Sequence, residues 1–186
     1  MLILDLCGGT GSWSEPYRAA GYCVEVIDPK RDGRDVRLLQ RVKAGVHGIL
    51  AAPPCTKFTV SGNGARAKEK AAGTYDAGIR EALSVVDACV RIAWVQQPLW
   101  WALENPVGTL VHYLGPPLMS FQPADYGDPY TKRTLLWGRF TPPPMVRRVA
   151  ATEGSKLWRL PPSPERATVR SMTPPGFARA FFESNP

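Results

Sequence analysis

The first half of the chain alternates short apolar runs with stretches that have a helical pattern. The apolar runs cover residues 2–6, 23–27, 48–52 and 99–103. Runs of this length that end in glycine, proline or charged residues are typical of buried strands. The helical patterns cover residues 13–20, 36–43 and 75–95, and the last has one apolar face. The alternation predicts an α/β fold in which helices flank a sheet.

The first predicted strand ends in a glycine-rich turn, Cys7-Gly8-Gly9-Thr10-Gly11-Ser12. Strand, turn and helix form the entry to a doubly wound nucleotide-binding fold, where glycine lets the backbone approach a ligand. Asp28 follows the second strand, where an acidic residue suits a ribose diol. The Gly-Gly-x-Gly spacing favours S-adenosylmethionine over a dinucleotide, because that cofactor has no pyrophosphate. The alternative is a turn that binds no ligand.

A cysteine on a stiff loop follows the third predicted strand. Pro53 and Pro54 fix the backbone directly before Cys55, so its thiol is presented at the end of a strand. Glu104 ends the fourth strand, and the carboxyl ends of strands are where open α/β sheets bind ligands. The chain has only two histidines. The combination of Cys55 with Glu104 therefore indicates a nucleophile with an acid rather than a protease. An ordinary buried cysteine is the alternative.

Composition narrows the class of protein. The 186 residues suit one domain, and the net charge of +7 favours a polyanionic partner, above all nucleic acid. The four cysteines are widely spaced, so neither a metal site nor a disulfide framework is expected. No apolar run reaches the ~18 residues that cross a membrane. The chain begins without a signal peptide pattern, so we expect a cytoplasmic protein.

Two basic segments follow the candidate nucleophile. Residues 61–73 are rich in glycine and lysine and predict a mobile loop. Residues 139–170 carry seven Lys or Arg against two Glu, with clustered prolines, and predict an irregular basic segment. Trp158 is expected there as an anchor or a stacking residue. The alternative for this segment is a solvated linker.

Four motifs together carry a family resemblance. They are residues 5–11, Pro53-Pro54-Cys55, Glu104-Asn105-Pro106 and residues 126–134. In this order they resemble the cytosine-5 DNA methyltransferases, in a compact, phage-type form. The resemblance covers residues 1–138 and resumes near Arg170. It implies an S-adenosylmethionine-dependent, Rossmann-like mixed sheet over 1–138, a short segment at 139–170 replacing a target-recognition domain, and a C-terminal helix within 171–186 that returns to the core.

The resemblance also implies a mechanism. Cys55, as a thiolate that the site should favour, attacks carbon 6 of a cytosine flipped out of duplex DNA. Glu104 holds ring nitrogen 3 and the exocyclic amine, and Arg133 helps to hold the flipped base. Carbon 5 then takes a methyl group from S-adenosylmethionine, which leaves S-adenosylhomocysteine. The basic loop after Cys55 closes over the base.

The resemblance implies two further sets of residues. Those expected at the cofactor are Asp5, Cys7, Gly8, Gly9, Thr10, Gly11, Ser12, Trp13, Asp28, Asp35 and Pro53. Among them Asp28 takes the ribose hydroxyls and Asp35 the adenine amine. The family usually stacks a Phe on the cofactor where Cys7 stands, and Trp13 is expected to compensate. Those expected at DNA are Lys57, Ser61, Arg66, Lys68, Lys132, Arg147, Arg148 and Arg159.

The short basic segment limits sequence recognition. Phosphate contacts position a duplex but carry no sequence information, so we expect a very short or degenerate target. We expect a monomer in the cytoplasm, or in the host cytoplasm if the chain is phage-encoded. Two alternatives stay open: a catalytically silent DNA-binding relative, and a cytosine-5 methyltransferase that acts on RNA.

Overall fold

The computed structural model describes residues 1–42, 44–60 and 63–186, and within them six strands form one mixed sheet. The strands are β1 (Leu2–Leu6), β2 (Cys23–Ile27), β3 (Val46–Ala51), β4 (Trp100–Pro106), β5 (Met119–Phe121) and β6 (Thr134–Arg139). The helices are α1 (Glu15–Ala19), α2 (Asn63–Ala71), α3 (Tyr75–Gln96), α4 (Val111–Leu114), α5 (Arg166–Ser171) and α6 (Pro175–Ser184), with the 3-10 helices η1 (Val36–Leu38) and η3 (Pro123–Tyr126).

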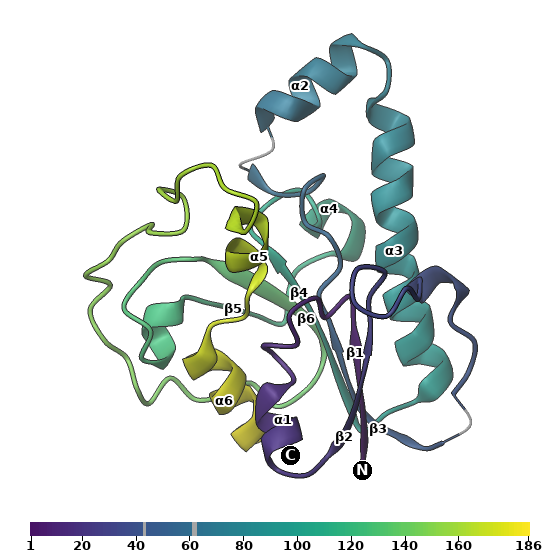
Figure 1. Ribbon diagram of the computed structural model, residues 1–186, viewed down its shortest axis with the longest axis vertical. Coiled ribbons are helices and arrows are strands. Elements are labelled where there is room, and N and C mark those ends of the chain that lie inside the picture. The colour runs from purple at the N-terminus through teal and green to yellow at the C-terminus, as the bar shows by residue number, and fades with distance from the viewer. Residues whose placement is uncertain (43, 61–62) are drawn as a thin grey trace.

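The strand order is β2-β1-β3-β4-β6-β5. The first four strands in this order are parallel, whereas β6 is antiparallel to both β4 and β5. Figure 1 shows α3 on one side of the sheet and α1 with α6 on the other. The predicted α/β class, with a Rossmann-like mixed sheet flanked by helices, is therefore confirmed.

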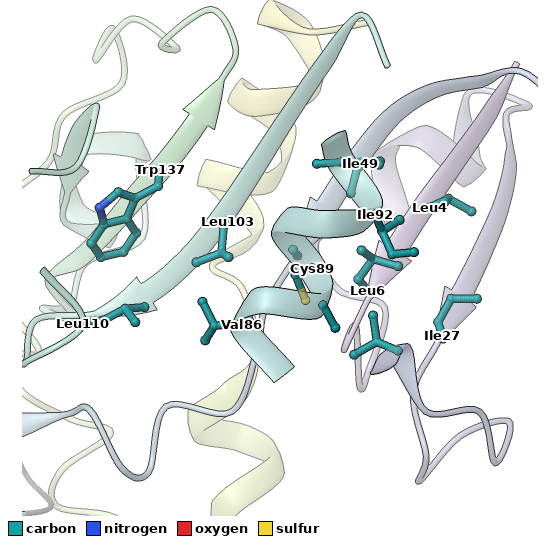
Figure 2. Close-up of a cluster of buried hydrophobic side chains, with 14 of the residues drawn as sticks. Leu4, Leu6, Ile27, Ile49, Val86, Cys89, Ile92, Leu103, Leu110 and Trp137 are labelled. Carbon is teal, nitrogen blue, oxygen red and sulfur yellow. The ribbon is translucent and has the colours of Figure 1, made fainter. Parts of the chain in front are cut away.

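Alternation along the strands builds two cores. On one face, Leu4 and Leu6 of β1 pack with the apolar side of α3, where Val86, Cys89 and Ile92 are buried. Figure 2 shows these α3 side chains pointing at the sheet. On the other face, Ile3 of β1 packs beneath α1 and α6. The aromatic rings of this second core are Trp13, Tyr17, Trp100, Phe121, Tyr126, Phe140, Phe177 and Phe181.

Two secondary-structure expectations were wrong. Residues 63–71 form α2 rather than a loop, because their Ala, Lys, Glu and Arg are strong helix formers. The helix expected over residues 36–43 is only the three-residue η1, and Leu38 there is 81% exposed, so no apolar face supports a longer helix. Figure 1 shows α2 and the start of α3 extending beyond the body of the fold.

The chain between β6 and α5 is irregular. Residues 140–165, all of which the structure describes, contain no strand or helix. The segment ends in α5, and α6 then packs against α1 and η3. Within the described residues, no helix combines the length and the apolar character needed to span a bilayer.

Candidate active site

The carboxyl ends of four parallel strands meet at one edge of the sheet. The register pairs Leu6 with Ile27 and with Ala51, and Ala51 with Leu103. The residues that follow these four are Cys7, Asp28, Ala52 and Glu104. Parallel pairing therefore brings the glycine turn, the acidic residue after β2, the Cys55 loop and Glu104 to the same edge, as the sequence predicts.

The Cys55 loop is held by its neighbours. The side-chain amide of Asn105 donates to the carbonyl oxygen of Pro53 at 3.0 Å. The carbonyl of Cys55 accepts from the backbone nitrogens of Phe58 and Thr59, both at 2.9 Å. Phe58 is fully buried and anchors the far end of the loop. The carbonyl of Pro53 is thus bound inside the protein, whereas the sequence placed Pro53 at the cofactor.

The thiol of Cys55 is half-buried, in surroundings that act against its ionisation. Burial raises its pKa, the negative charge of Glu104 raises it further, and Lys132 and Arg170 act in the opposite direction. The expectation that this site favours the thiolate is therefore wrong for the protein without substrate. Bond formation at Cys55 requires that its proton first leave, since only the thiolate is a strong nucleophile.

Glu104 has an environment that favours its neutral form. Burial raises the pKa of this carboxyl, and Lys132 lowers it. Glu104 lies within β4 rather than just after it, because β6 extends the pairing and sets Leu136 opposite Glu104. The side chain lies on the same face of the sheet as Ala102, two residues earlier.

Lys132 is the cation whose charge acts on both Cys55 and Glu104. Its ammonium donates to the carbonyl oxygen of Met172 at 3.0 Å, so the residue just after α5 helps to position it. Arg133, which was expected to help hold the flipped base, is exposed, and its carbonyl accepts a long, 3.4 Å hydrogen bond from the backbone nitrogen of Val107. Lys132 was expected only as a DNA contact.

The glycine turn is tied to the acidic residue after β2. The carboxylate of Asp28 accepts from the backbone nitrogens of Gly9 at 3.1 Å and Lys30 at 2.9 Å. Gly11 has φ +72°, a conformation that favours glycine, and a Cβ there would meet the guanidinium of Arg31. Arg31 also donates to the carbonyl of Gly9 at 3.3 Å. Sequence reasoning missed Arg31, because it lies about 20 residues after the turn in the sequence and comes close to it only in the folded chain.

Asp5 lies beneath this turn and is fully buried. Burial raises its pKa to about 6, and a hydrogen bond of 2.5 Å from the Ser14 hydroxyl acts against that rise. Its other oxygen, Oδ1, has no hydrogen-bond partner in the part of the chain that the structure describes. A Cβ at Gly8 would overlap the carboxylate, so glycine is required there. Asp5 thus supports the turn from inside.

The two side chains expected to stack on the cofactor lie elsewhere. Trp13 is 2% exposed, and its ring packs against Phe177 and Phe181 at centroid distances of 6.2 and 5.4 Å. This contradicts the expectation that it compensates for Cys7. Cys7 is half-buried, packs against the α3 core and has φ +56°. The turn itself remains, with the hydroxyls of Thr10 and Ser12 beside it; Ser12 also accepts from the backbone nitrogen of Thr173 at 2.9 Å.

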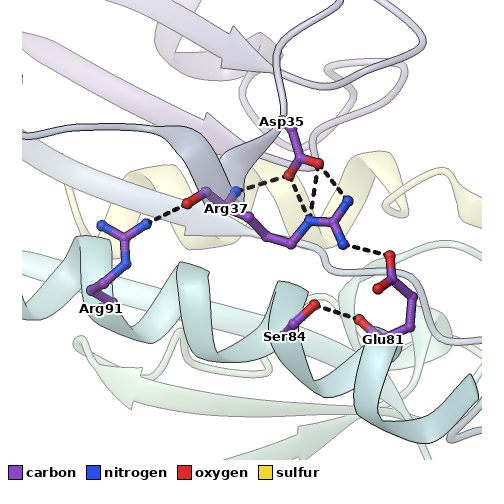
Figure 3. Close-up of polar contacts among 5 residues, drawn as sticks. All are labelled: Asp35, Arg37, Glu81, Ser84 and Arg91. Carbon is purple, nitrogen blue, oxygen red and sulfur yellow. Dashed lines mark hydrogen bonds and ion pairs between the residues drawn. The ribbon is translucent and has the colours of Figure 1, made fainter. Parts of the chain in front are cut away.

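Asp35 is engaged by a neighbouring arginine. Figure 3 shows its carboxylate bonded to the guanidinium and backbone nitrogen of Arg37, which also pairs with Glu81 of α3. These bonds cap η1 and hold the pKa of Asp35 below its ordinary value. An adenine amine would have to share a carboxylate that Arg37 already occupies.

The residues expected at DNA have varied surroundings. Lys57 forms an ion pair of 2.5 Å with Glu69, and buried Arg66 donates to the carbonyls of Lys57 and Thr59. Arg66 thus braces the Cys55 loop rather than facing solvent. Lys68 is exposed on α2, and Ser61 lies outside the described residues.

The three arginines of the basic segment that were expected at DNA are exposed, and each has an intramolecular partner. Arg147 lies 3.8 Å from Glu183, Arg148 lies 2.9 Å from Asp125, and Arg159 donates to the carbonyl of Glu153. Single surface ion pairs of this kind contribute little to stability and can exchange for a phosphate. In the described part of the chain, no group of three or more His, Cys, Asp or Glu side chains could hold a metal ion.

The fold is similar to that of solved methyltransferases, whereas neither a family model nor a curated protein matches this chain. One neighbour is a prophage-encoded E. coli protein described as a candidate DNA modification methyltransferase. It has a TM-score of 0.50 and 18% identity, over 89% of this chain and 49% of that one. Another is the Entamoeba histolytica methyltransferase EhMeth, with a TM-score of 0.46 and 15% identity over 76% and 53%. The chain spans about half the length of these structures, and its fold is a methyltransferase fold.

Proposed function

We propose that this protein transfers a methyl group from S-adenosylmethionine to carbon 5 of cytosine in DNA. The observation that carries the proposal is the convergence of Cys55, Glu104 and Lys132 at the sheet edge that also holds the glycine turn. A protonatable acid beside a thiol suits addition to a pyrimidine ring, which needs a nucleophile and an acid together. The methyltransferase fold and the net charge of +7 support the same proposal.

Glu104 would act as the acid. In its neutral form the carboxyl donates a hydrogen bond to ring nitrogen 3 and accepts one from the exocyclic amine. A proton on Glu104 also removes the charge that raises the pKa of Cys55. Neutral Glu104 therefore favours the Cys55 thiolate, and transfer of a proton from the thiol to an ionised Glu104 would leave the net charge of the pair unchanged.

Cys55 would then form the covalent bond. As its sulfur bonds to carbon 6, the electron pair of the 5,6 double bond becomes available at carbon 5, and charge develops at nitrogen 3 beside Glu104. S-adenosylmethionine, when bound, supplies the electrophilic methyl group. Water takes the proton from carbon 5, and the electron pair left there re-forms the 5,6 double bond as the bond between sulfur and carbon 6 breaks. The ring is restored and Cys55 leaves as a thiolate.

Lys132 would supply the positive charge at this site. It acts on both the thiol and the carboxyl, and its side chain is positioned by the carbonyl of Met172. An ammonium there favours the thiolate by direct attraction. Lys132, expected from the sequence only as a DNA contact, is thus proposed as the site cation, whereas Arg133 was expected to help hold the flipped base.

The residues of the glycine turn fit S-adenosylmethionine. Asp28 lies at the end of β2 beside the backbone of Gly9, where its carboxylate can accept from ribose hydroxyls. Thr10 and Ser12 add hydroxyl groups, and the exposed guanidinium of Arg31 suits the carboxylate of the methionine part. The proposed parts are a core over 1–138, a basic segment over 139–170 and a C-terminal helix within 171–186.

The target carbon is stacked inside duplex DNA, so the cytosine must be flipped out. The expected partner is duplex DNA, held by phosphate contacts from exposed basic residues such as Lys68 and Arg148. The basic segment is too short for a separate recognition domain. We therefore propose that target choice is short or degenerate.

The test incubates the protein with labelled S-adenosylmethionine and duplex DNA or transfer RNA, then identifies the methylated nucleoside by mass. We expect label in 5-methylcytosine of DNA. Cys55→Ser should abolish transfer and covalent trapping on DNA that contains 5-fluorocytosine. Cys23→Ser is the matched control, because Cys23 is exposed at the opposite end of β2. Trapping by Cys55→Ser would contradict the mechanism.

A catalytically silent DNA-binding relative is the second candidate. The observations that favour it are the raised pKa of Cys55 and the burial of Trp13, which removes an expected cofactor contact. DNA binding without label in DNA or RNA would support this candidate. Label in transfer RNA alone would instead indicate an RNA methyltransferase.

A further inference from the structure

Trp158 is held in place, yet its side chain lies largely in water. The residue is 59% exposed. Its backbone nitrogen donates to the carbonyl of Ser155 at 3.0 Å, and its own carbonyl accepts from Arg166 at 3.3 Å. An indole is among the largest apolar groups, and leaving one in solvent forgoes the free energy of burying it. A fixed but exposed indole is therefore preorganised to pack against a flat or apolar group of a ligand.

Two sets of contacts connect the segment around Trp158 to the chain on either side of Lys132. On one side, Thr131 bonds to the carbonyl of Gly154 at 2.9 Å and to the hydroxyl of Ser155 at 3.2 Å. Ser155 is the residue that holds the backbone of Trp158, and Thr131 directly precedes Lys132. The irregular segment is thus fastened to the chain that carries the site cation.

On the other side, the guanidinium carbon of Arg170 lies 5.7 Å from the centre of the Trp158 ring. Arg170 belongs to α5, and Met172, two residues further on, binds the ammonium of Lys132 at 3.0 Å. Arg170 is also one of the cations that lower the pKa of Cys55. The chain before Trp158 is therefore bonded to Thr131, and the Trp158 ring lies against Arg170. Thr131 adjoins Lys132 in the sequence, and Arg170 is close in sequence to Met172, which binds Lys132.

We propose that Trp158, with Arg170 against its ring, forms a stacking site for one unpaired nucleobase of the DNA at the mouth of the Cys55 site. This inference rests on the proposed function and adds a binding site to it. Aromatic rings stack on bases of any sequence, because every base has a π face. Neighbouring Lys156, which pairs with Glu153, and Arg159, which donates to the carbonyl of Glu153, are exposed cations that can exchange these partners for the phosphates on either side. Such a site would help to hold a strand that base flipping has opened.

The test compares two labelled duplexes made only of dA and dT, so that neither offers a cytosine. One is fully paired and the other carries a single unpaired dT. Binding is measured by fluorescence anisotropy for the wild type, Trp158→Ala, Trp158→Phe and Trp94→Ala. Trp94 is the matched control, because it is 77% exposed and lies in the last turn of α3, remote from the Cys55 edge.

Trp158→Ala should bind the duplex with the unpaired base roughly 5- to 150-fold more weakly, with a much smaller loss for the paired duplex. Trp158→Phe should retain most of the affinity, because phenylalanine also stacks. Trp94→Ala should bind as the wild type does. In the wild type, the duplex with the unpaired base should also quench a part of the tryptophan fluorescence that is missing in Trp158→Phe.

Equal binding by Trp158→Ala and the wild type would overturn the stacking site, as would an equal loss on both duplexes. If either result comes with normal methyl transfer by the wild type, only this inference fails. A wild type that neither binds DNA nor transfers the label would overturn the proposed function together with it. Thermal unfolding of each variant checks that the fold is intact.

Discussion

The side-chain amide of Asn105 donates a hydrogen bond of 3.0 Å to the carbonyl oxygen of Pro53. Asn105 is fully buried in β4, next to Glu104, and Pro53 lies two residues before Cys55. This one bond joins the strand that carries the acid to the loop that carries the nucleophile. It gives the two groups a fixed relative position, which catalysis by orientation requires.

Asn105→Ala should therefore reduce methyl transfer more than it reduces stability. Without the bond the Cys55 loop is less well positioned, and we expect kcat to fall by about 10- to 100-fold. Stability should fall by about 1–3 kcal/mol, because the carbonyl of Pro53 loses its partner in a buried place. The matched control is Val86→Ala, which lowers stability in the α3 core without touching the loop. Equal kcat for both variants would contradict the positioning role.

Exchange of Glu104 should change the titration of Cys55 in a defined direction. The charge of Glu104 raises the pKa of that thiol, so Glu104→Gln should lower it. Alkylation of Cys55 by iodoacetamide, followed by mass spectrometry against pH, should then begin at lower pH than in the wild type. Exposed Cys23 serves as the reference within the same protein, and its profile should not move.

Lys132→Met should have the opposite effect, because Lys132 lowers the pKa of the same thiol. Alkylation of Cys55 should begin at higher pH, and kcat should fall. Lys132→Arg keeps the charge and should restore much of the alkylation profile, whereas Arg133→Met should leave it unchanged. A larger effect at Arg133 than at Lys132 would contradict this role of Lys132 and assign the site cation to Arg133.

The sequence predicts the elements that depend on local pattern and on strand order. Strands β1 and β2 have the predicted bounds, and Cys55 and Glu104 lie at one edge because parallel strands end together. What it misses depends on contacts between distant segments. Trp13 is buried because α6, about 160 residues later, packs on it, and no local pattern announces that contact.

Contacts between distant segments also decide whether Lys132 or Arg133 lies at the site. Adjacent residues of an extended chain point to opposite sides, so a motif alone does not say which one enters a site. Here Thr131 is fixed by Gly154, and Lys132 then reaches Met172. The prediction of a loop over residues 61–73 was wrong for another reason. The glycines and lysines there indicated a loop, but the alanines and charged residues of 63–71 form α2.

The proposed short or degenerate target is tested by sequencing plasmid DNA after methylation in cells. Phosphate contacts from residues such as Lys68 and Arg148 act on any sequence, so methylated cytosines should occur in many contexts. Binding should weaken steeply with salt, as counterion release requires. A strict site of about five or six base pairs would require base contacts that confer sequence specificity.

Asp5 makes stability depend on pH in a way that can be isolated. Its pKa is raised from the ordinary 3.8 to about 6, so between those values the folded protein binds more protons than the unfolded chain. Stability from this group is therefore complete below about pH 4 and is lost as pH rises through about 6. The loss amounts to about 3 kcal/mol for a shift of about two units.

Asp5→Asn removes the titrating group. The unfolding free energy of the variant minus that of the wild type should therefore increase from pH 4 to pH 7, because only the wild type loses stability through Asp5. Urea unfolding at each pH measures it, and taking the difference cancels the other carboxyls. Ser14→Ala removes the hydrogen bond that lowers the pKa of Asp5, so it should move the wild-type loss to higher pH. A difference that stays constant across this range would mean that Asp5 does not titrate there, and that its carboxylate beneath the glycine turn stays ionised.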